Sequence, residues 1–480
     1  MSPPIALALT LLLIGYLLRR DIRQEPRVSM AIWIPILWLM INGSRQVSQW
    51  LEGAPAVQFS AEALSDGNPI DKAVYSALML AGLCVLARRR VQVGEIFKNN
   101  TAIILFLLYA ALSVVWSDEP LTALKRWVKA FGDPVMVLVL WSDPAPVRAV
   151  VAAIKRCAYV LIPLSALFCK YYVDLGRNFD SWGKISYTGV TTDKNMFGYL
   201  LFAFGLFFAA SLLSGRGSSD GGDRPDRTDR VTCLLMLAMI GWLIPIANSK
   251  TSTVALALGV AVVLAVQLAT VRRHFWLYAI PTVGLLMIFE ELFSVKGAIL
   301  EASDRDATFT GRTGLWEMVL HEPINPLLGE GYGSFWLGER LERFWAMYPT
   351  SPPIQAHNGY IEIYLNLGLV GVLLIAGVLW AGLRTMQRRA TATVTGPVAA
   401  THDEQTLATF GLGYGIAYLF YNITEATFQG LNPLFTIFLI LAFVHRGITE
   451  TSATSQSSMV SADFGEQAGP RPVEQPRGVG

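Results

Sequence analysis

The sequence carries little charge for its length. Of its 480 residues, 53% are hydrophobic and only 15% are charged, whereas a soluble domain carries about 25% charged residues. Apolar runs recur along most of the chain at lengths typical of membrane-spanning helices. The alternating segments of about 10 residues that a transmembrane β-barrel needs are missing. We therefore expect an all-α polytopic membrane protein.

Cysteine is scarce, and its placement argues against a structural metal site. The four cysteines, Cys84, Cys157, Cys169 and Cys233, lie within or at the ends of apolar runs, and none has a partner at metal-ligand spacing. They are typical of small buried hydrophobic residues. We expect no metal, no cofactor and no nucleic-acid partner.

The amino terminus lacks the pattern of a cleavable signal peptide. The first apolar run, residues 5–18, has no basic residue before it and is followed by Arg19 and Arg20. This order is the reverse of a secretory signal. It predicts a first membrane helix that begins outside and ends inside.

Thirteen apolar runs are candidate spans, and the first of them is either part of the bundle or an addition to a core of twelve. They lie near residues 4–18, 29–42, 73–87, 101–117, 128–141, 150–170, 196–213, 231–247, 252–270, 274–293, 359–383, 406–421 and 431–445. Lysine and arginine are dense in alternate connections, which are then the inside ones. The fold expected is a bundle of about 12–13 transmembrane helices with one long outer loop.

This pattern divides the chain into four parts. Residues 1–293 hold about ten membrane helices, and residues 294–358 form the long outer loop. Residues 359–446 hold about three more helices. Residues 447–480 are rich in Ser, Gln, Pro and Gly and are expected to be a disordered tail on the inner side.

Two short outer segments carry a lysine at the start of an apolar run. Lys194 and Asn195 stand directly before one span, where a helix cap or a contact to a phosphate or hydroxyl group is expected, and the two are compatible. Lys250 lies in a tight turn between two spans. It is either a lysine that extends to the membrane surface or a cation aimed into an outer cavity.

The long outer loop is the one extended polar interruption in the hydrophobic second half of the chain. It opens with TGRTGLW, in which Arg312 and Trp316 have the spacing of one helix face. Gly329, Gly331 and Gly333 alternate in LLGEGYGSFW. Glycines permit positive φ angles and close backbone approach, either to a ligand or to the bundle itself. Their spacing does not match a dinucleotide-binding motif.

The loop ends in AHNGYIEIYLNLG, where His357 and Asn358 precede the next span and Glu362 lies near its outer end. A histidine in this position is often a cap or a structural hydrogen-bonding group. Because Arg312 and Glu362 belong to the same outer region and have no obvious ion-pair partner nearby in sequence, a catalytic base or a substrate-orienting histidine is the alternative.

The runs TGRTGLWEMVLHEPINPLLGEGYGSFW and AHNGYIEIYLNLGLVG resemble the signature of the O-antigen ligase and polysaccharide polymerase family. TTDKNMFGYLL and NITEATFQGLNPLFTIFL are similar to segments of its exopolysaccharide-polymerase branch. The resemblance covers residues 188–444 well and the first half only in its pattern of spans.

The resemblance implies a glycosyltransferase of the bacterial inner membrane, with its active site on the periplasmic side. The donor would be a glycan on undecaprenyl diphosphate, and neither a nucleotide sugar nor a metal would be needed. Membrane lipid and a chain-length regulator are further implied partners. Arg312 matches the arginine of the family that binds the diphosphate. His357 matches the histidine expected to activate or orient the acceptor hydroxyl, and we assign Glu362 to the acceptor side.

We assign further substrate contacts to Lys194, Asn195, Lys250, Trp316, Gly331 and Asn358. Lys194 or Lys250 stands where ligases often use a second arginine. We expect a polymerase that extends a lipid-linked repeat unit. The alternatives are a ligase that transfers glycan to the lipid A–core saccharide, and a flippase or transporter of lipid-linked sugars. A transporter would place ionisable residues within the spans, whereas the charges here cluster at span ends.

Overall fold

The structure, a computed structural model, is helical almost throughout and describes residues 1–51, 67–179, 183, 185–214, 227–281, 312–348, 352–396 and 399–444. Its longer helices are α1 (Pro3–Gln24), α2 (Trp33–Asn42), α5 (Pro69–Arg88), α7 (Thr101–Leu112), α8 (Pro120–Trp141), α9 (Pro146–Tyr171), α11 (Lys194–Ser214), α12 (Arg227–Ala247), α13 (Lys250–Ala265), α18 (Gly338–Met347), α19 (Gly359–Thr395), α20 (His402–Thr424) and α21 (Pro433–Ala442). The shorter elements are η1 (Met30–Ile32), α3 (Val47–Leu51), α6 (Val93–Asn99), η2 (Ser113–Trp116), α10 (Val173–Gly176), β1 (Arg177–Phe179), β2 (Ile185–Tyr187), α14 (Ala269–Arg273) and α17 (Arg312–Leu320). The expected all-α class is confirmed.

The predicted spans coincide with helices wherever the structure describes them. Five described helices, α5, α9, α11, α12 and α19, are long and apolar enough to cross a membrane, and α6 with residues 101–116 forms a sixth if that pair, bent by 99°, is one span. Several other predicted spans are shorter apolar helices, such as α13 and α21. The chain is therefore a polytopic membrane protein. The number of spans supported by length and composition in its described part is five or six, below the 12 to 13 expected.

Two predicted parts of the chain lie largely outside the described residues. These are the end of the span 274–293 with the start of the outer loop, up to residue 311, and the tail from residue 445. The division into four parts stays a prediction.

The core of the bundle is built by α11, α19, α20 and α21, with α9 beside them. Aromatic rings fill it: Phe202 stacks on Tyr414 and on Tyr421, with ring centroids 5.5 and 5.4 Å apart. Large rings bury much apolar area and fit the space between facing helices. This packing fixes the ends of α11 and α20 relative to each other.

Helix α19 is broken at Gly368, whose φ of 63° and ψ of −165° are not helical. Backbone groups of residues 326–331 pair with the broken turn: Gly331 donates its N–H to Asn366 at 2.8 Å, and Leu369 donates to Pro326 at 2.9 Å. A Cβ on Gly368 would lie 2.2 Å from the Leu327 carbonyl carbon. Glycine is therefore required where the outer loop inserts against the helix.

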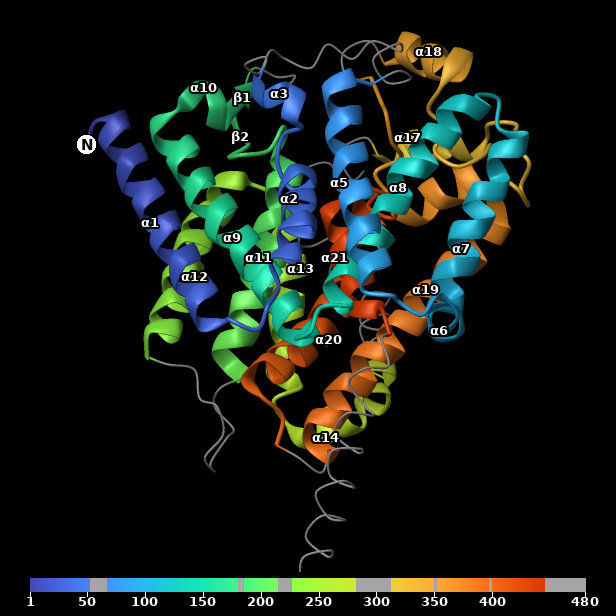
Figure 1. Ribbon diagram of the computed structural model, residues 1–480. Helices are drawn as coiled ribbons and strands as arrows, with labels where there is room; N and C mark the ends of the chain where they lie inside the picture. Colours follow the sequence, from blue (N-terminus) through green and yellow to red (C-terminus); the bar gives the residue numbers. More distant parts are fainter. Residues whose placement is uncertain are drawn as a thin grey trace, which may run out of the picture.

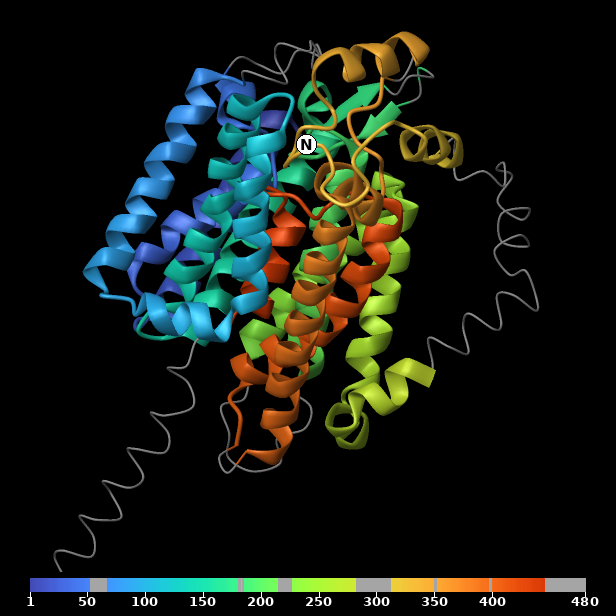
Figure 2. The same cartoon turned by 90° about the vertical axis from the view of Figure 1, so that its right-hand side faces the viewer.

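The segments expected on the outer side gather at one end of the bundle (Figure 1). The hairpin β1–β2, α3, α10 and α18 lie there, as does the start of α1, while α14 lies at the opposite end. The view turned by 90° shows α18, in orange, across the same end (Figure 2). At the opposite end, Arg156 donates to Asp21 at 2.6 Å. The connections predicted to lie outside and those predicted to lie inside are therefore at opposite ends of the bundle. The side of the membrane that each end faces stays a prediction.

Candidate active site

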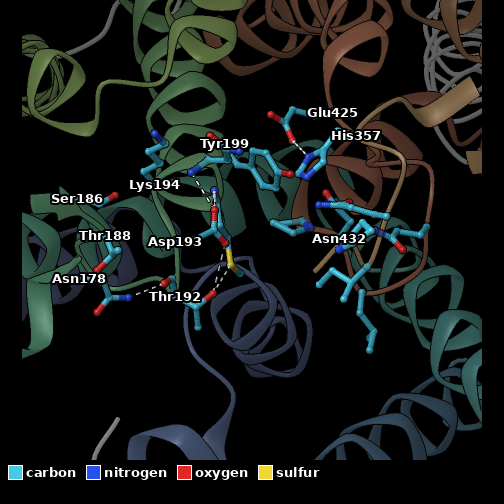
Figure 3. A pocket seen from close by; sticks show the side chains of 18 of the residues that line it. Asn178, Ser186, Thr188, Thr192, Asp193, Lys194, Tyr199, His357, Glu425 and Asn432 are labelled. Atoms are coloured by element: carbon cyan, nitrogen blue, oxygen red, sulfur yellow. Dashed lines mark hydrogen bonds and ion pairs between the residues drawn. The ribbon is translucent and has the colours of Figure 1, made fainter. Parts of the chain in front are cut away.

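A cavity of about 990 Å³ opens at the end of the bundle where the outer segments meet. Its walls come from the β1–β2 hairpin, the start of α11, the residues before α19 and the connection between α20 and α21. Figure 3 shows side chains from these segments facing one space, with His357 and Glu425 on one side and Asp193 and Lys194 on the other. Segments distant in sequence thus form one polar chamber.

Arg312, His357 and Glu425 form a connected cluster on the cavity wall. Arg312 Nη2 donates to Glu425 Oε1 at 2.9 Å, and its Nη1 donates to the Thr424 carbonyl. His357 Nδ1 lies 3.3 Å from the other carboxylate oxygen, Oε2. The Glu425 side chain is only 2% exposed, against 19% for Arg312 and 32% for His357. One buried carboxylate therefore holds both of the more exposed groups.

The contact with Glu425 determines which nitrogen of a neutral His357 ring keeps its lone pair. An ionised carboxylate only accepts hydrogen bonds. In a neutral ring the proton must then sit on Nδ1, which leaves Nε2 as the basic atom. Among the described residues no hydrogen-bond partner of Nε2 is found. The geometry suits a histidine that accepts a proton.

Glu425 is placed by the junction of two helices. It caps the end of α20, and its carbonyl accepts the Gly359 N–H at 3.1 Å. Asn358 caps the start of α19 through the backbone N–H groups of Tyr360 and Ile361, and its Nδ2 donates to Ile423 at 3.0 Å. Asn358 is therefore a structural cap that joins α19 to α20, next to the predicted histidine.

The backbone of His357 has a φ of 50°, in the left-handed region that non-glycine residues rarely adopt. Its neighbour Ala356 is held from two sides: Trp316 Nε1 donates to the Ala356 carbonyl at 2.7 Å, and the Ala356 N–H donates to Glu362 at 2.9 Å. Backbone strain of this kind persists only where the surroundings over-determine it. Trp316 and Glu362 thus hold the histidine in place without lining the cavity.

The start of α11 forms the opposite wall. Asp193 caps this helix by accepting the N–H groups of Asn195 and Met196 at 2.9 and 3.0 Å. Lys194 and Asn195 both line the cavity, as predicted from sequence. The Asp193 side chain faces the cavity and is surrounded by protein. This burial raises the pKa of its carboxyl, and the negative charge of Glu425 raises that pKa further.

Five of the predicted site residues do not line this cavity: Trp316 and Asn358, whose positions are described above, and Glu362, Gly331 and Lys250. Glu362 does not touch His357, because its carboxylate accepts from Trp336 Nε1 at 2.9 Å, from Ala356 and from Asn366. Gly331, at a φ of 96°, packs on the backbone of residues 113–117 and on α19. Lys250 begins α13 and is exposed, beside Thr251, whose hydroxyl contacts Thr424 at 3.0 Å.

Glu425, Asn42 and Thr188 were missed in the sequence. Asn42 and Thr188 line the cavity and are 4% and 0% exposed. Among the described residues, neither Asn42 Nδ2 nor Thr188 Oγ1 has a hydrogen-bond partner, although both atoms are buried. Buried polar atoms are normally paired with protein or water. A signal for Glu425 did exist, since it is the single carboxylate directly after an apolar run in NITEATF.

Residues 233–376 match the sequence profile of a family described as O-antigen ligase. This segment is an O-antigen ligase family domain. The chain is also a distant homologue of "Exopolysaccharide production protein ExoQ" from Rhizobium meliloti (strain 1021). The two are 24% identical over 319 residues, which cover 64% of this chain and 68% of that protein.

The O-antigen ligase domain contains Arg312 and His357 but ends before Glu425, and it begins after the Asp193–Asn195 wall. Members of this family are glycan polymerases and ligases, and the family implies lipid-linked glycans as substrates. The cavity therefore combines residues from the matched domain with residues from the flanking helices.

The chemistry available in the cavity is proton transfer and anion binding. His357 offers a basic nitrogen, and Arg312 keeps three N–H groups beyond the two that bind Glu425 and Thr424. Lys194 adds a second cation. Among the described residues, no group of three or more His, Cys, Asp or Glu side chains is arranged to hold a metal ion.

Proposed function

We propose that this protein is a polysaccharide polymerase of the bacterial inner membrane. It transfers a glycan from undecaprenyl diphosphate to the hydroxyl group of a lipid-linked repeat unit at the periplasmic face, in exopolysaccharide or O-antigen synthesis. The observation that supports the proposal is the Arg312–Glu425–His357 cluster on the wall of one polar cavity, because an arginine suits phosphate binding and a histidine suits proton transfer.

The reaction needs two kinds of help, and the cluster supplies both. The acceptor oxygen forms a bond to the anomeric carbon of the donor, and its proton passes to His357 Nε2. The bond between that carbon and the phosphate oxygen breaks, and the diphosphate leaves with the bonding electrons. Arg312 donates its free N–H groups to the departing phosphate, with Lys194 across the cavity.

Glu362, Trp316 and Asn358 act as positioning residues in this proposal. They hold the backbone on both sides of His357, and Asn195 and Lys194 form the wall that faces it. Lys250 and Gly331 lie outside the cavity and have no assigned contact in this scheme.

A ligase is the second candidate, because the matched domain carries the description O-antigen ligase. The chemistry would be the same, with the lipid A–core saccharide as acceptor. The likeness to a protein of exopolysaccharide production favours the polymerase.

The test uses purified protein with undecaprenyl-diphosphate-linked repeat units. We expect Arg312→Ala and His357→Asn to abolish chain elongation, and Arg312→Ala also to weaken binding of undecaprenyl diphosphate. Asparagine tolerates the left-handed backbone at residue 357, so that variant separates chemistry from folding. Normal elongation by either variant would overturn the site assignment.

Matched controls come from the same outer loop. Arg343, on α18, pairs with Glu322 at 2.9 Å and is 60% exposed, and His321 is exposed at the end of α17. Arg343→Ala and His321→Asn should elongate chains normally. Transfer to lipid A–core with no elongation by the wild-type protein would identify the ligase instead.

A further inference from the structure

A second groove, of about 410 Å³, lies between α5 and α8 at the same end of the molecule. Four basic side chains line it: Lys72 from α5 and Lys125, Arg126 and Lys129 from α8. No acidic residue is found among its described lining residues. The reaction cavity differs, because Arg312 and Lys194 there face Glu425 and Asp193.

Two of these lysines converge on one point. Lys129 Nζ and Lys72 Cε lie 3.6 and 3.9 Å from the position that a Cβ on Gly67 would occupy. Within the part of the chain that the structure describes, neither lysine has an ion pair. The nearest acid on α5, Asp71, is buried and accepts hydrogen bonds from the Ser48 backbone and hydroxyl. Clustered cations of this kind attract a multiply charged anion.

A smaller groove borders both the basic groove and the reaction cavity. This groove, of about 310 Å³, shares Arg126 and Lys129 with the basic groove and is also lined by residues 429–431. The same three residues, Gln429, Gly430 and Leu431, line the reaction cavity. The short segment 429–431 therefore lies between the smaller groove and the reaction cavity.

Exposed apolar side chains lie in and beside the basic groove. Its floor includes Trp38 and Met79, and Leu124 and Val128 on α8 are 45% and 39% exposed. On α5, Leu80 is 61% exposed. Exposed apolar side chains on a membrane helix face the bilayer, so a lipid can enter this groove sideways with its head group at the lysines.

We propose that the basic groove binds the diphosphate of the acceptor lipid while the reaction cavity receives the donor. The inference rests on the proposed polymerase function, in which two polyprenyl diphosphates must be bound at the same time. The acceptor glycan then passes the 429–431 segment and presents its terminal hydroxyl to His357. A ligase needs a single polyprenyl diphosphate, so this second site belongs to a polymerase.

The experiment compares two acceptors in the full-length protein in nanodiscs. One is the repeat unit on undecaprenyl diphosphate, and the other is the same oligosaccharide as a free glycoside without lipid or phosphate. For Lys72→Gln/Lys129→Gln, we expect the KM for the lipid-linked acceptor to rise at least about tenfold, the loss expected for one charge-assisted phosphate contact. Transfer to the free glycoside should stay at the wild-type rate, which also shows that the variant is folded.

The control double variant is Lys98→Gln/Lys170→Gln, which removes two exposed lysines outside the groove and should keep the wild-type KM. Binding of undecaprenyl diphosphate alone should fall from two molecules per chain to one in the groove variant. An unchanged KM in that variant, with wild-type elongation intact, would overturn the second site. A wild-type protein that elongates neither acceptor would instead overturn the proposed function.

Bulk phospholipid is the competing occupant. The assay is therefore repeated in nanodiscs of phosphatidylcholine alone and of phosphatidylcholine with phosphatidylglycerol. An effect of the lysine substitutions that persists in phosphatidylcholine supports the acceptor site. An effect that requires phosphatidylglycerol would show that the groove binds lipid head groups and would overturn the inference.

Discussion

Replacement of Glu425 by glutamine tests whether the buried carboxylate orients His357. Glutamine has nearly the same shape, and its carbonyl oxygen can still accept from Arg312. Its amide, however, presents N–H groups toward His357 Nδ1, which now lies 3.3 Å from a carboxylate oxygen. A neutral ring must then carry its proton on Nε2, and Nε2 no longer has a lone pair that can accept a proton.

The size of the effect follows from the geometry. Proton transfer by a positioned side chain contributes about 10²–10⁴-fold to a rate. The contact of 3.3 Å is longer than a well-formed hydrogen bond, so we place the loss in kcat near the lower end, at about 100-fold. The hydrogen bond to Arg312 survives, which limits the loss of stability to about 1–3 kcal/mol.

The assay is the initial rate of chain elongation at saturating donor, together with binding of undecaprenyl diphosphate and the melting temperature in detergent. We expect kcat to fall while diphosphate binding is kept, a split that a purely structural role would not produce. Glu322→Gln, which alters an ion pair of the outer loop with Arg343, is the matched control. A folded Glu425→Gln protein with wild-type kcat would refute the reasoning.

Three further changes give separate expectations. Gly368→Ala puts a Cβ 2.2 Å from the Leu327 carbonyl carbon at a positive φ, so it should destabilise the protein by at least about 2 kcal/mol in chemical unfolding; a neutral result would contradict the inserted loop. Asp193→Asn keeps the helix cap but removes a carboxylate whose pKa the surroundings raise. Ionisation of the Asp193 carboxyl destabilises the folded state, so the variant should melt at a higher temperature than wild type at alkaline pH. The difference in melting temperature should disappear as the pH falls below about 4, where the carboxyl is protonated in both the folded and the unfolded protein. Thr188→Val removes a buried hydroxyl that has no hydrogen-bond partner in the described part of the chain, so the melting temperature should hold or rise while the KM for glycan increases if that hydroxyl binds sugar.

The helices could be predicted because the length and polarity of an apolar run are local properties. The run at 196–213 became α11, and the run at 406–421 became the buried part of α20. That Arg312 and His357 share a cavity was also predictable, because both residues belong to the same outer loop. The number of spans was not, because apolar composition does not separate a full crossing from a shorter helix such as α13.

The partner of His357 could not be predicted from spacing. Glu362 is five residues away and is the nearest carboxylate in sequence. His357, however, precedes the helix and has a left-handed backbone, so helical spacing does not apply to it. Glu425 is 68 residues distant. Its contact depends on where α20 ends against the start of α19, and that junction is set by tertiary packing.

The break in α19 has a consequence for exchanging parts between relatives. The N–H groups of Glu330, Gly331, Leu369 and Val370 all donate across the joint between the outer loop and the helix. A loop transplanted alone would leave these groups unpaired inside the protein. A chimera designed to change glycan specificity should therefore exchange residues 326–331 and 365–370 together. The two segments are separate in sequence but form one hydrogen-bonded unit.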